Sequence, residues 1–120
     1  MYLLVNVLEQ PEHLVAILEG FAKIGIKGST VMNSTGMGRV LMKAGADGPA
    51  MEEINKMIAD GESSNKTIFT VVKEKALLDQ AIAVVKSLCG DLCEPGKGVL
   101  FAVPLALVEG VPETAEDKKV

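Results

Sequence analysis

The two halves of this 120-residue chain repeat one pattern, and that repetition restricts its fold more than any other feature of the sequence. In the first half, residues 2–8 (YLLVNVL) are rich in leucine and valine and indicate a buried strand. Pro11 suits the first turn of a helix, and Gly25 ends that helix. Its apolar residues recur at helical spacing, at Leu14, Ile17, Leu18 and Phe21. A second strand is predicted at roughly 29–35.

The second half follows the same order. Residues 66–72 (KTIFTVV) indicate a strand, and apolar residues at helical spacing follow at 78–88. A glycine-rich loop at 90–98 leads into an apolar strand at 99–108, where Pro104 marks a sheet edge, a bulge or a break because it cannot donate a ladder hydrogen bond. The order βαββαβ predicts an α+β fold, the ferredoxin-like sandwich, whose antiparallel sheet packs one face on two helices.

One ferredoxin-like domain at residues 1–112 accounts for these elements. Between the two halves, residues 37–65 are expected to form a long loop with a short helix of its own, indicated by Met51, Ile54, Met57 and Ile58. Connections of this length are typically functional or disordered. Residues 113–120 mix charges of both signs and lack aromatic residues, which predicts a flexible charged tail.

The charge and hydropathy of the chain restrict which kinds of partner it can have. The chain has 16 acidic and 12 basic residues without a basic stripe, so no nucleic-acid partner is expected. A mean hydropathy of +0.31 is high for so small a domain, and the surplus apolar surface predicts a homo-oligomeric interface. No run approaches the roughly 20 apolar residues that span a bilayer, and the first residues lack the pattern of a signal peptide. We therefore expect a cytoplasmic protein without membrane insertion.

The sequence shows no set of residues typical of an active site, so an enzyme is not expected. Cys89 and Cys93 are too few for a disulfide scaffold or a structural zinc site, and His13 lies far from them in sequence. Packing near a helix end is the simpler interpretation of the two cysteines, and a reversible disulfide or redox role is the alternative.

Two glycine-rich turns that carry a cation are the candidate binding features. The first, Gly36-Met37-Gly38-Arg39, follows the second strand, where backbone N–H groups and Arg39 would capture phosphate, unless the turn is a plain exit from the strand. The second is Pro95-Gly96-Lys97-Gly98, where Lys97 would contact a phosphate, unless the glycines serve turn geometry only. This second turn lacks the spacing of a Walker motif.

These residues resemble the nitrogen-regulatory P-II family of trimeric signal proteins. The match is closest from Pro11 to Arg39, where the helix, Gly25-Ile26-x-Gly28-x-Thr30-Val31 and Gly36-x-Gly38-Arg39 follow the family's register without a gap. In the second half, Lys97 after a glycine is similar to the end of the family's nucleotide-binding loop. The resemblance covers most of the chain in layout and a smaller part of it in motif.

What the resemblance implies is a homotrimer that binds adenine nucleotides in clefts between subunits. The long loop after GxGR would contact a target protein, such as a transporter or a metabolic enzyme. One side of the cleft would be lined by Ser29, Thr30, Gly36, Met37, Gly38 and Arg39. The other side would be lined by Val71, Gly96 and Lys97.

The chain departs from the family at several binding positions. The family's glutamine after GxGR, used for magnesium and 2-oxoglutarate, is Val40, and the 37–65 loop lacks the tyrosine that the family modifies. Glu94-Pro95 replaces an aspartate of the glycine loop, and the last strand, at 99–109, lacks arginines. Each lost charged contact removes on the order of 1–3 kcal/mol of binding energy. We therefore expect a divergent P-II-like regulator of a partner protein that does not bind ATP tightly. Its effector would be a small anion, with an adenine nucleotide as the candidate, and no cofactor or metal is assigned.

Two other classes stay open from the sequence. A structural or metal-related trimer like the CutA proteins, which share the architecture, would need a cluster of metal ligands, and the sequence offers few. A small ferredoxin-like enzyme that uses Cys89 or Cys93 would need a base within reach, and none is evident.

Overall fold

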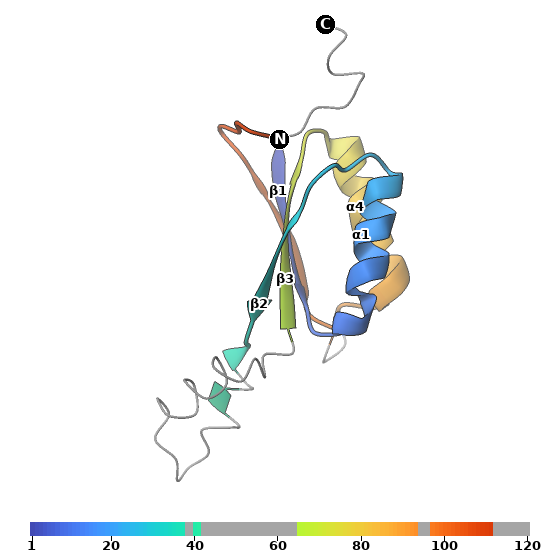
Figure 1. The fold of residues 1–120 in the computed structure, drawn as a ribbon, viewed down its shortest axis with the longest axis vertical. Helices are drawn as coiled ribbons and strands as arrows, with labels where there is room; N and C mark the ends of the chain where they lie inside the picture. The colour runs from blue at the N-terminus through green and yellow to red at the C-terminus, as the bar shows by residue number, and fades with distance from the viewer. Residues whose placement is uncertain (38–39, 42–64, 94–96, 112–120) are drawn as a thin grey trace, which may run out of the picture.

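The computed structural model describes residues 1–37, 40–41, 65–93 and 97–111 (Figure 1). The order of strands and helices in each half is as predicted. The elements are β1 (Tyr2–Leu8), the short 3-10 helix η1 (Pro11–His13), α1 (Leu14–Lys23), β2 (Thr30–Ser34), β3 (Asn65–Val72), α4 (Lys75–Cys89) and β4 (Val99–Pro104).

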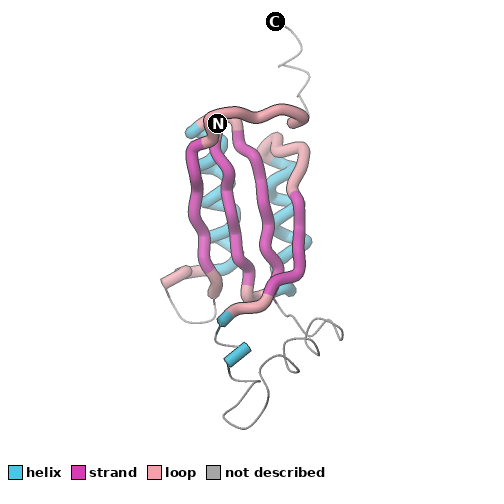
Figure 2. The backbone as a smooth tube through the Cα atoms, turned by 90° about the vertical axis from the view of Figure 1, so that its left-hand side faces the viewer, coloured by secondary structure: helices cyan, strands magenta, loops and turns pink. Residues whose placement is uncertain are grey.

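The strands form one sheet in the order β2-β3-β1-β4, and every neighbouring pair is antiparallel. Helices α1 and α4 lie side by side on one face of this sheet, and the other face carries no described helix (Figure 2). This α+β arrangement confirms the predicted antiparallel sheet with two helices and is compatible with the ferredoxin-like fold. It makes β1 and β3 the central strands and leaves β2 and β4 as the edges.

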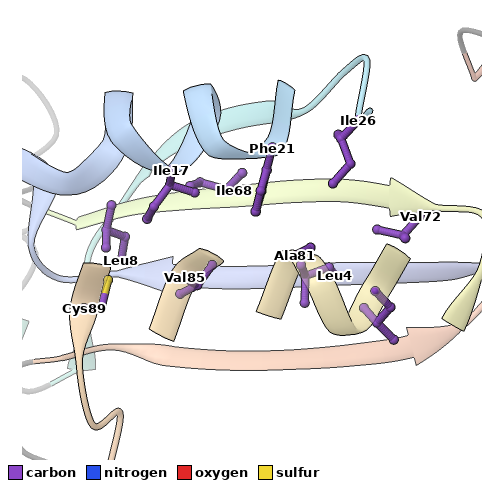
Figure 3. Close-up of a cluster of buried hydrophobic side chains, with 11 residues drawn as sticks. Leu4, Leu8, Ile17, Phe21, Ile26, Ile68, Val72, Ala81, Val85 and Cys89 are labelled. Carbon is purple, nitrogen blue, oxygen red and sulfur yellow. The ribbon is translucent and has the colours of Figure 1, made fainter. Parts of the chain in front are cut away.

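The hydrophobic core lies between the two helices and the sheet, and it draws on both halves of the chain (Figure 3). Because side chains alternate along a strand, every second residue of β1 faces the helices, and Leu4 and Leu8 are at most 1% exposed. Helix α1 contributes Ile17 and Phe21, which confirms two positions of its predicted apolar face. Helix α4 contributes Leu78, Ala81, Val85 and Cys89.

The two helices approach each other closely at Gly20 of α1. An ideal Cβ at this position would lie 2.6 Å from Cγ1 of Val84 on α4. No side chain of ordinary size fits there without a shift of its neighbour. The absence of a side chain at Gly20 therefore sets how tightly α1 packs against α4.

A glycine lies just after the end of helix α1, and a proline lies at the end of strand β4. Helix α1 ends at Lys23, and Gly25 has a φ of 102°, in the left-handed region that glycine adopts without strain. Strand β4 ends at Pro104, so the predicted strand at 99–108 is too long at its C-terminal end. Pro104 lies on an edge strand, opposite Tyr2, as expected of a residue without an N–H group. The chain then crosses the end of the sheet (Figure 2).

The sheet face opposite the helices, called the open face below, is largely apolar. Directly paired residues point to the same side of a sheet, and the register therefore puts two apolar rows across the open face: Phe69–Val5–Phe101 and Val71–Leu3–Val103. Phe101 is 47% exposed and Val103 is 42% exposed. A contiguous apolar surface of this kind is typical of an interaction site.

Several expectations fall outside the described residues. They concern most of the 37–65 loop, its short helix, and the 113–120 tail. Of the predicted loop, Met37, Val40 and Leu41 are described and are helical, and its last residue, Asn65, is the first residue of β3. A separate finding concerns membranes: no described helix combines the length and the apolar character needed to cross one.

Candidate functional site

One end of the sheet, where β2 begins and β3 ends, holds three predicted site residues around a cavity of about 340 Å³. Ser29, Thr30 and Val71 line this cavity together with Phe69. The facing wall is the segment after β4, Val108–Val111. We call this cavity the upper pocket, since it lies at the upper end of the sheet in Figure 2.

The polar groups of the upper pocket are hydroxyls and a balanced pair of charges. The Ser29 Oγ lies 2.8 Å from the Oγ1 of Thr70, a residue only 1% exposed, so a partly buried hydrogen bond holds the Ser29 side chain. Lys27 and Glu109 bring one cation and one carboxylate to the lining. The pocket therefore suits a flat or partly apolar group with hydrogen-bonding atoms better than several phosphates.

The sequence does not predict the wall at Val108–Val111. The predicted last strand extends to Val108, whereas β4 ends at Pro104 and the chain then crosses the end of the sheet. Gly110, with a φ of 87°, lies in this wall. Pro104 and Gly110 indicate this exit in the sequence. A proline within a strand, with a glycine a few residues later, is typical of a chain that leaves the sheet. Lys27, next to Gly28, was also missed.

The opposite end of the sheet, where β2 ends and β4 begins, holds Gly36, Met37 and Lys97. Met37 is 79% exposed and Lys97 is half-buried. The Val40 N–H donates to the Gly36 carbonyl at 3.1 Å, a bond of the helical i to i+4 type, so a helical turn begins where the sequence predicts a released backbone. Gly38, Arg39 and Gly96 lie outside the described residues.

The glycines at this lower end differ in what they require. Among the described residues, a Cβ on Gly36 would meet the Asn65 Nδ2 alone, at an ordinary 3.6 Å. Gly98, by contrast, has a φ of 97°, and a Cβ there would collide with the carbonyl oxygen of Val7. For Gly98, turn geometry is a sufficient reason for glycine. This contact also fixes the neighbouring Lys97 at the end of the sheet.

Within one chain, the predicted site residues form two separate sets. Thr30 to Ser34 alone span about 13 Å of extended backbone, and Gly36 lies beyond the far end of that strand. At the lower end, Gly36 and Lys97 flank opposite edges of the sheet, three strand spacings or about 14 Å apart. The resemblance puts Ser29 and Gly36 on one side of a cleft, and in this chain the extended backbone of β2 lies between them.

The two cysteines have different surroundings. Cys89, the last residue of α4, is 2% exposed, as the packing interpretation expects. Burial raises the pKa of its thiol, the positive charge of Lys97 opposes this rise, and the negative charge of Glu12 adds to it. Cys93 is exposed, and its N–H donates to Asp91 Oδ1 at 2.9 Å. Both thiols are free.

No group of three or more potential metal ligands gathers anywhere in the described part of the chain. His13, which the sequence analysis places far from the cysteines, is half-buried in η1. No model of a known protein family matches this chain, and no curated protein matches it. The P-II resemblance therefore rests on the residues quoted for it.

Proposed function

We propose that this chain is a non-enzymatic, cytoplasmic regulatory protein of the P-II-like type. Three copies would assemble into a homotrimer and bind a small anionic effector in the clefts between subunits. An adenine nucleotide is the first candidate for that effector. The bound state would be passed to a partner protein through residues 37–65.

The observation that carries the proposal is the separation of the two sets of site residues. Ser29, Thr30 and Val71 lie at one end of the sheet, and Gly36, Met37 and Lys97 lie at the other. A compact ligand can contact both sets where the upper end of one copy meets the lower end of another. A single chain offers no such place along β2.

The open face supplies a surface that would hold the copies together. Its two apolar rows leave Phe101 and Val103 nearly half exposed in the single chain. Covering apolar area contributes about 25 cal/mol for each Å² removed from water. An assembly that buries three open faces around a common centre would also place the sheet ends beside one another.

The two ends offer complementary chemistry to a nucleotide-like ligand. The upper pocket supplies the hydroxyl of Thr30, which shares the open face of the sheet with Phe69 and Val71, and the apolar walls of those two residues for a ring system. The lower end supplies the cation of Lys97, which a phosphate would pair with. Regulation then requires that the effector bind one arrangement of the 37–65 segment more tightly than another, since only differential affinity shifts a population.

The assembly is tested by sedimentation equilibrium. Wild-type protein is expected at three times the 12.6 kDa chain mass. Phe101→Glu puts a charge at the β4 end of an open-face row, where the side chain is 47% exposed, and is expected to give monomers. The matched control is Val15→Glu on α1, a residue 65% exposed outside the sheet, which is expected to remain trimeric. A wild-type monomer would contradict the proposal.

The effector is tested by calorimetric titration with ATP, ADP, AMP and cyclic nucleotides. We expect saturable heat with at least one of them, weakened about ten-fold or more by Lys97→Gln through loss of a charge-assisted bond. Lys23→Gln makes the same charge change on the exposed end of α1 and is expected to bind as wild type does. The absence of heat with every nucleotide at millimolar concentration would remove the nucleotide from the proposal.

A further inference from the structure

A second cavity, of about 450 Å³, lies on the flank of α4 above the edge strand β4. It shares no residue with the upper pocket. Ile82 and Lys86 stand four residues apart on one side of α4 and form one wall. Gly90, with a φ of 79°, ends the helix, and the turn after it brings Asp91 and Leu92 back beside that wall. We call this cavity the flank pocket.

The floor of the flank pocket is apolar and continues into the core. Leu4, which is 1% exposed, lies at the floor together with Leu100 of β4. Leu100 and Leu92 are partly buried and pack against the core cluster. Because β4 is an edge of the sheet, no strand among the described residues closes the pocket on that side. The apolar floor is therefore open to a ligand.

Two opposite charges line the same pocket without neutralising each other. Among the described residues, an ion pair joins Lys75 to Asp79 at 2.6 Å, whereas Lys86 and Asp91 form no such pair. One carboxylate oxygen of Asp91 accepts the Cys93 N–H at 2.9 Å, which orients the group and leaves its second oxygen available. The pocket thus presents a separated cation and anion above an apolar floor.

We propose that the flank pocket binds a free α-amino acid with an apolar side chain. The ligand carboxylate pairs with Lys86, its ammonium group pairs with Asp91, and its side chain covers the floor formed by Leu4, Ile82 and Leu100. The volume lies within the range of about 300–1,000 Å³ that is usual for small-molecule sites. A simple anion would be repelled by Asp91, a simple cation would be repelled by Lys86, and an uncharged apolar molecule would leave both charges without a partner.

This site is independent of the nucleotide site proposed above, and it is tested on the full chain with L-leucine as the probe. Isothermal titration is expected to show saturable binding of one leucine per chain. Lys86→Gln and Asp91→Asn are each expected to weaken it about ten-fold or more. Both residues are exposed, so neither change disturbs the core. Lys23→Gln, the matched control, is expected to leave leucine binding unchanged, and glycine is expected to bind about ten-fold more weakly or worse, because it lacks the apolar side chain.

A second ligand distinguishes a site that binds both charges of an amino acid from a site that binds only its apolar side chain. N-acetyl-L-leucine lacks the ammonium group, so its binding is expected to be weakened by Lys86→Gln and not to be weakened by Asp91→Asn, which removes a repelling charge. The proposal is overturned if leucine shows no saturable binding up to about 10 mM, or if both charge variants bind it as wild type does. Titration of the same variants with nucleotides is a separate readout, so failure of this site and failure of the nucleotide site are distinguishable.

Discussion

Gly98 packs against the backbone of Val7 so closely that an ideal Cβ at position 98 would collide with the Val7 carbonyl oxygen. Its φ of 97° independently favours glycine. Strand β4 begins at the next residue, so this contact determines where the lysine-bearing loop rejoins the sheet.

Gly98→Ala is expected to lower the free energy of unfolding by about 3 kcal/mol or more, because left-handed backbone strain and a collision with backbone atoms act together. Urea denaturation measures the loss. Gly110→Ala is the matched control, since its φ is also positive but no atom of the described residues lies within 4 Å of the added Cβ. It is expected to lose only about 1–2 kcal/mol. Equal losses in the two variants would show that the contact with Val7 is unimportant.

The contact between Gly20 and Val84 predicts a coupled pair of substitutions. Gly20→Ala is expected to cost about 1–3 kcal/mol, because the new methyl group would lie 2.6 Å from the Val84 side chain. Val84→Ala removes the colliding methyl groups, so the double variant is expected to lose less stability than the two single losses combined. A double-mutant cycle by denaturant unfolding measures this coupling. If the two losses of unfolding free energy simply add in the double variant, the contact between Gly20 and Val84 does not limit how closely α1 and α4 pack.

Asn6 predicts a stabilising substitution. It is 1% exposed on the helix-facing side of β1, and within the described part of the chain neither its Nδ2 nor its Oδ1 has a hydrogen-bond partner. Asn6→Leu keeps a similar size and removes two unpaired polar groups, so the free energy of unfolding is expected to rise by about 1–3 kcal/mol.

The control for this prediction is another buried polar residue, Thr70, whose hydroxyl does have a partner in Ser29. Thr70→Val is expected to cost about 1 kcal/mol, because it breaks that bond. Thermal unfolding of the two variants gives the comparison. A destabilised Asn6→Leu variant would show that the amide is satisfied in solution.

The buried thiol of Cys89 predicts how stability depends on alkaline pH. Burial raises its pKa in the folded state, so the unfolded chain releases this proton first. The protonated Cys89 thiol makes its full contribution to the free energy of unfolding below the pKa of cysteine in the unfolded chain, about 8.5. This contribution is lost as the pH rises through the pKa of Cys89 in the folded state. Between neutral and alkaline pH, the stability of wild type is therefore expected to fall more steeply than that of Cys89→Val. Cys93→Ser is expected to keep the wild-type slope, and an unchanged slope in Cys89→Val would contradict the assignment.

Much of the fold was predictable because its signals are local. The apolar run at 2–8, the helical spacing through Ile17 and Phe21, and the stop at Gly25 each depend on neighbouring residues, and all three are confirmed. Long-range features were less accessible. That Asn6 lies in the core follows from the alternation of β1, but its missing partners depend on what α1 and α4 bring over it.

Three residues of the predicted site, Ser29, Thr30 and Val71, line one cavity, but the grouping of the predicted residues was not accessible from the sequence. The sequence gives no measure of how far an extended strand separates Ser29 from Gly36, and the fold puts them at opposite sheet ends. The wall at Val108–Val111 and the charges around the flank pocket arise from where the chain goes after Pro104 and Gly90. These turns depend on contacts with distant residues, which local patterns do not report.

The pairing of Ser34 with Asn65 has a consequence for how this scaffold can change. Residues 35–64 leave and re-enter the sheet at adjacent positions of one strand pair, so the rest of the register does not depend on their number. Doubling or halving such an insertion changes its closure entropy by only about 0.6 kcal/mol. The insertion can therefore be exchanged as a cassette, and a graft of a different length would leave the four-stranded platform as it is.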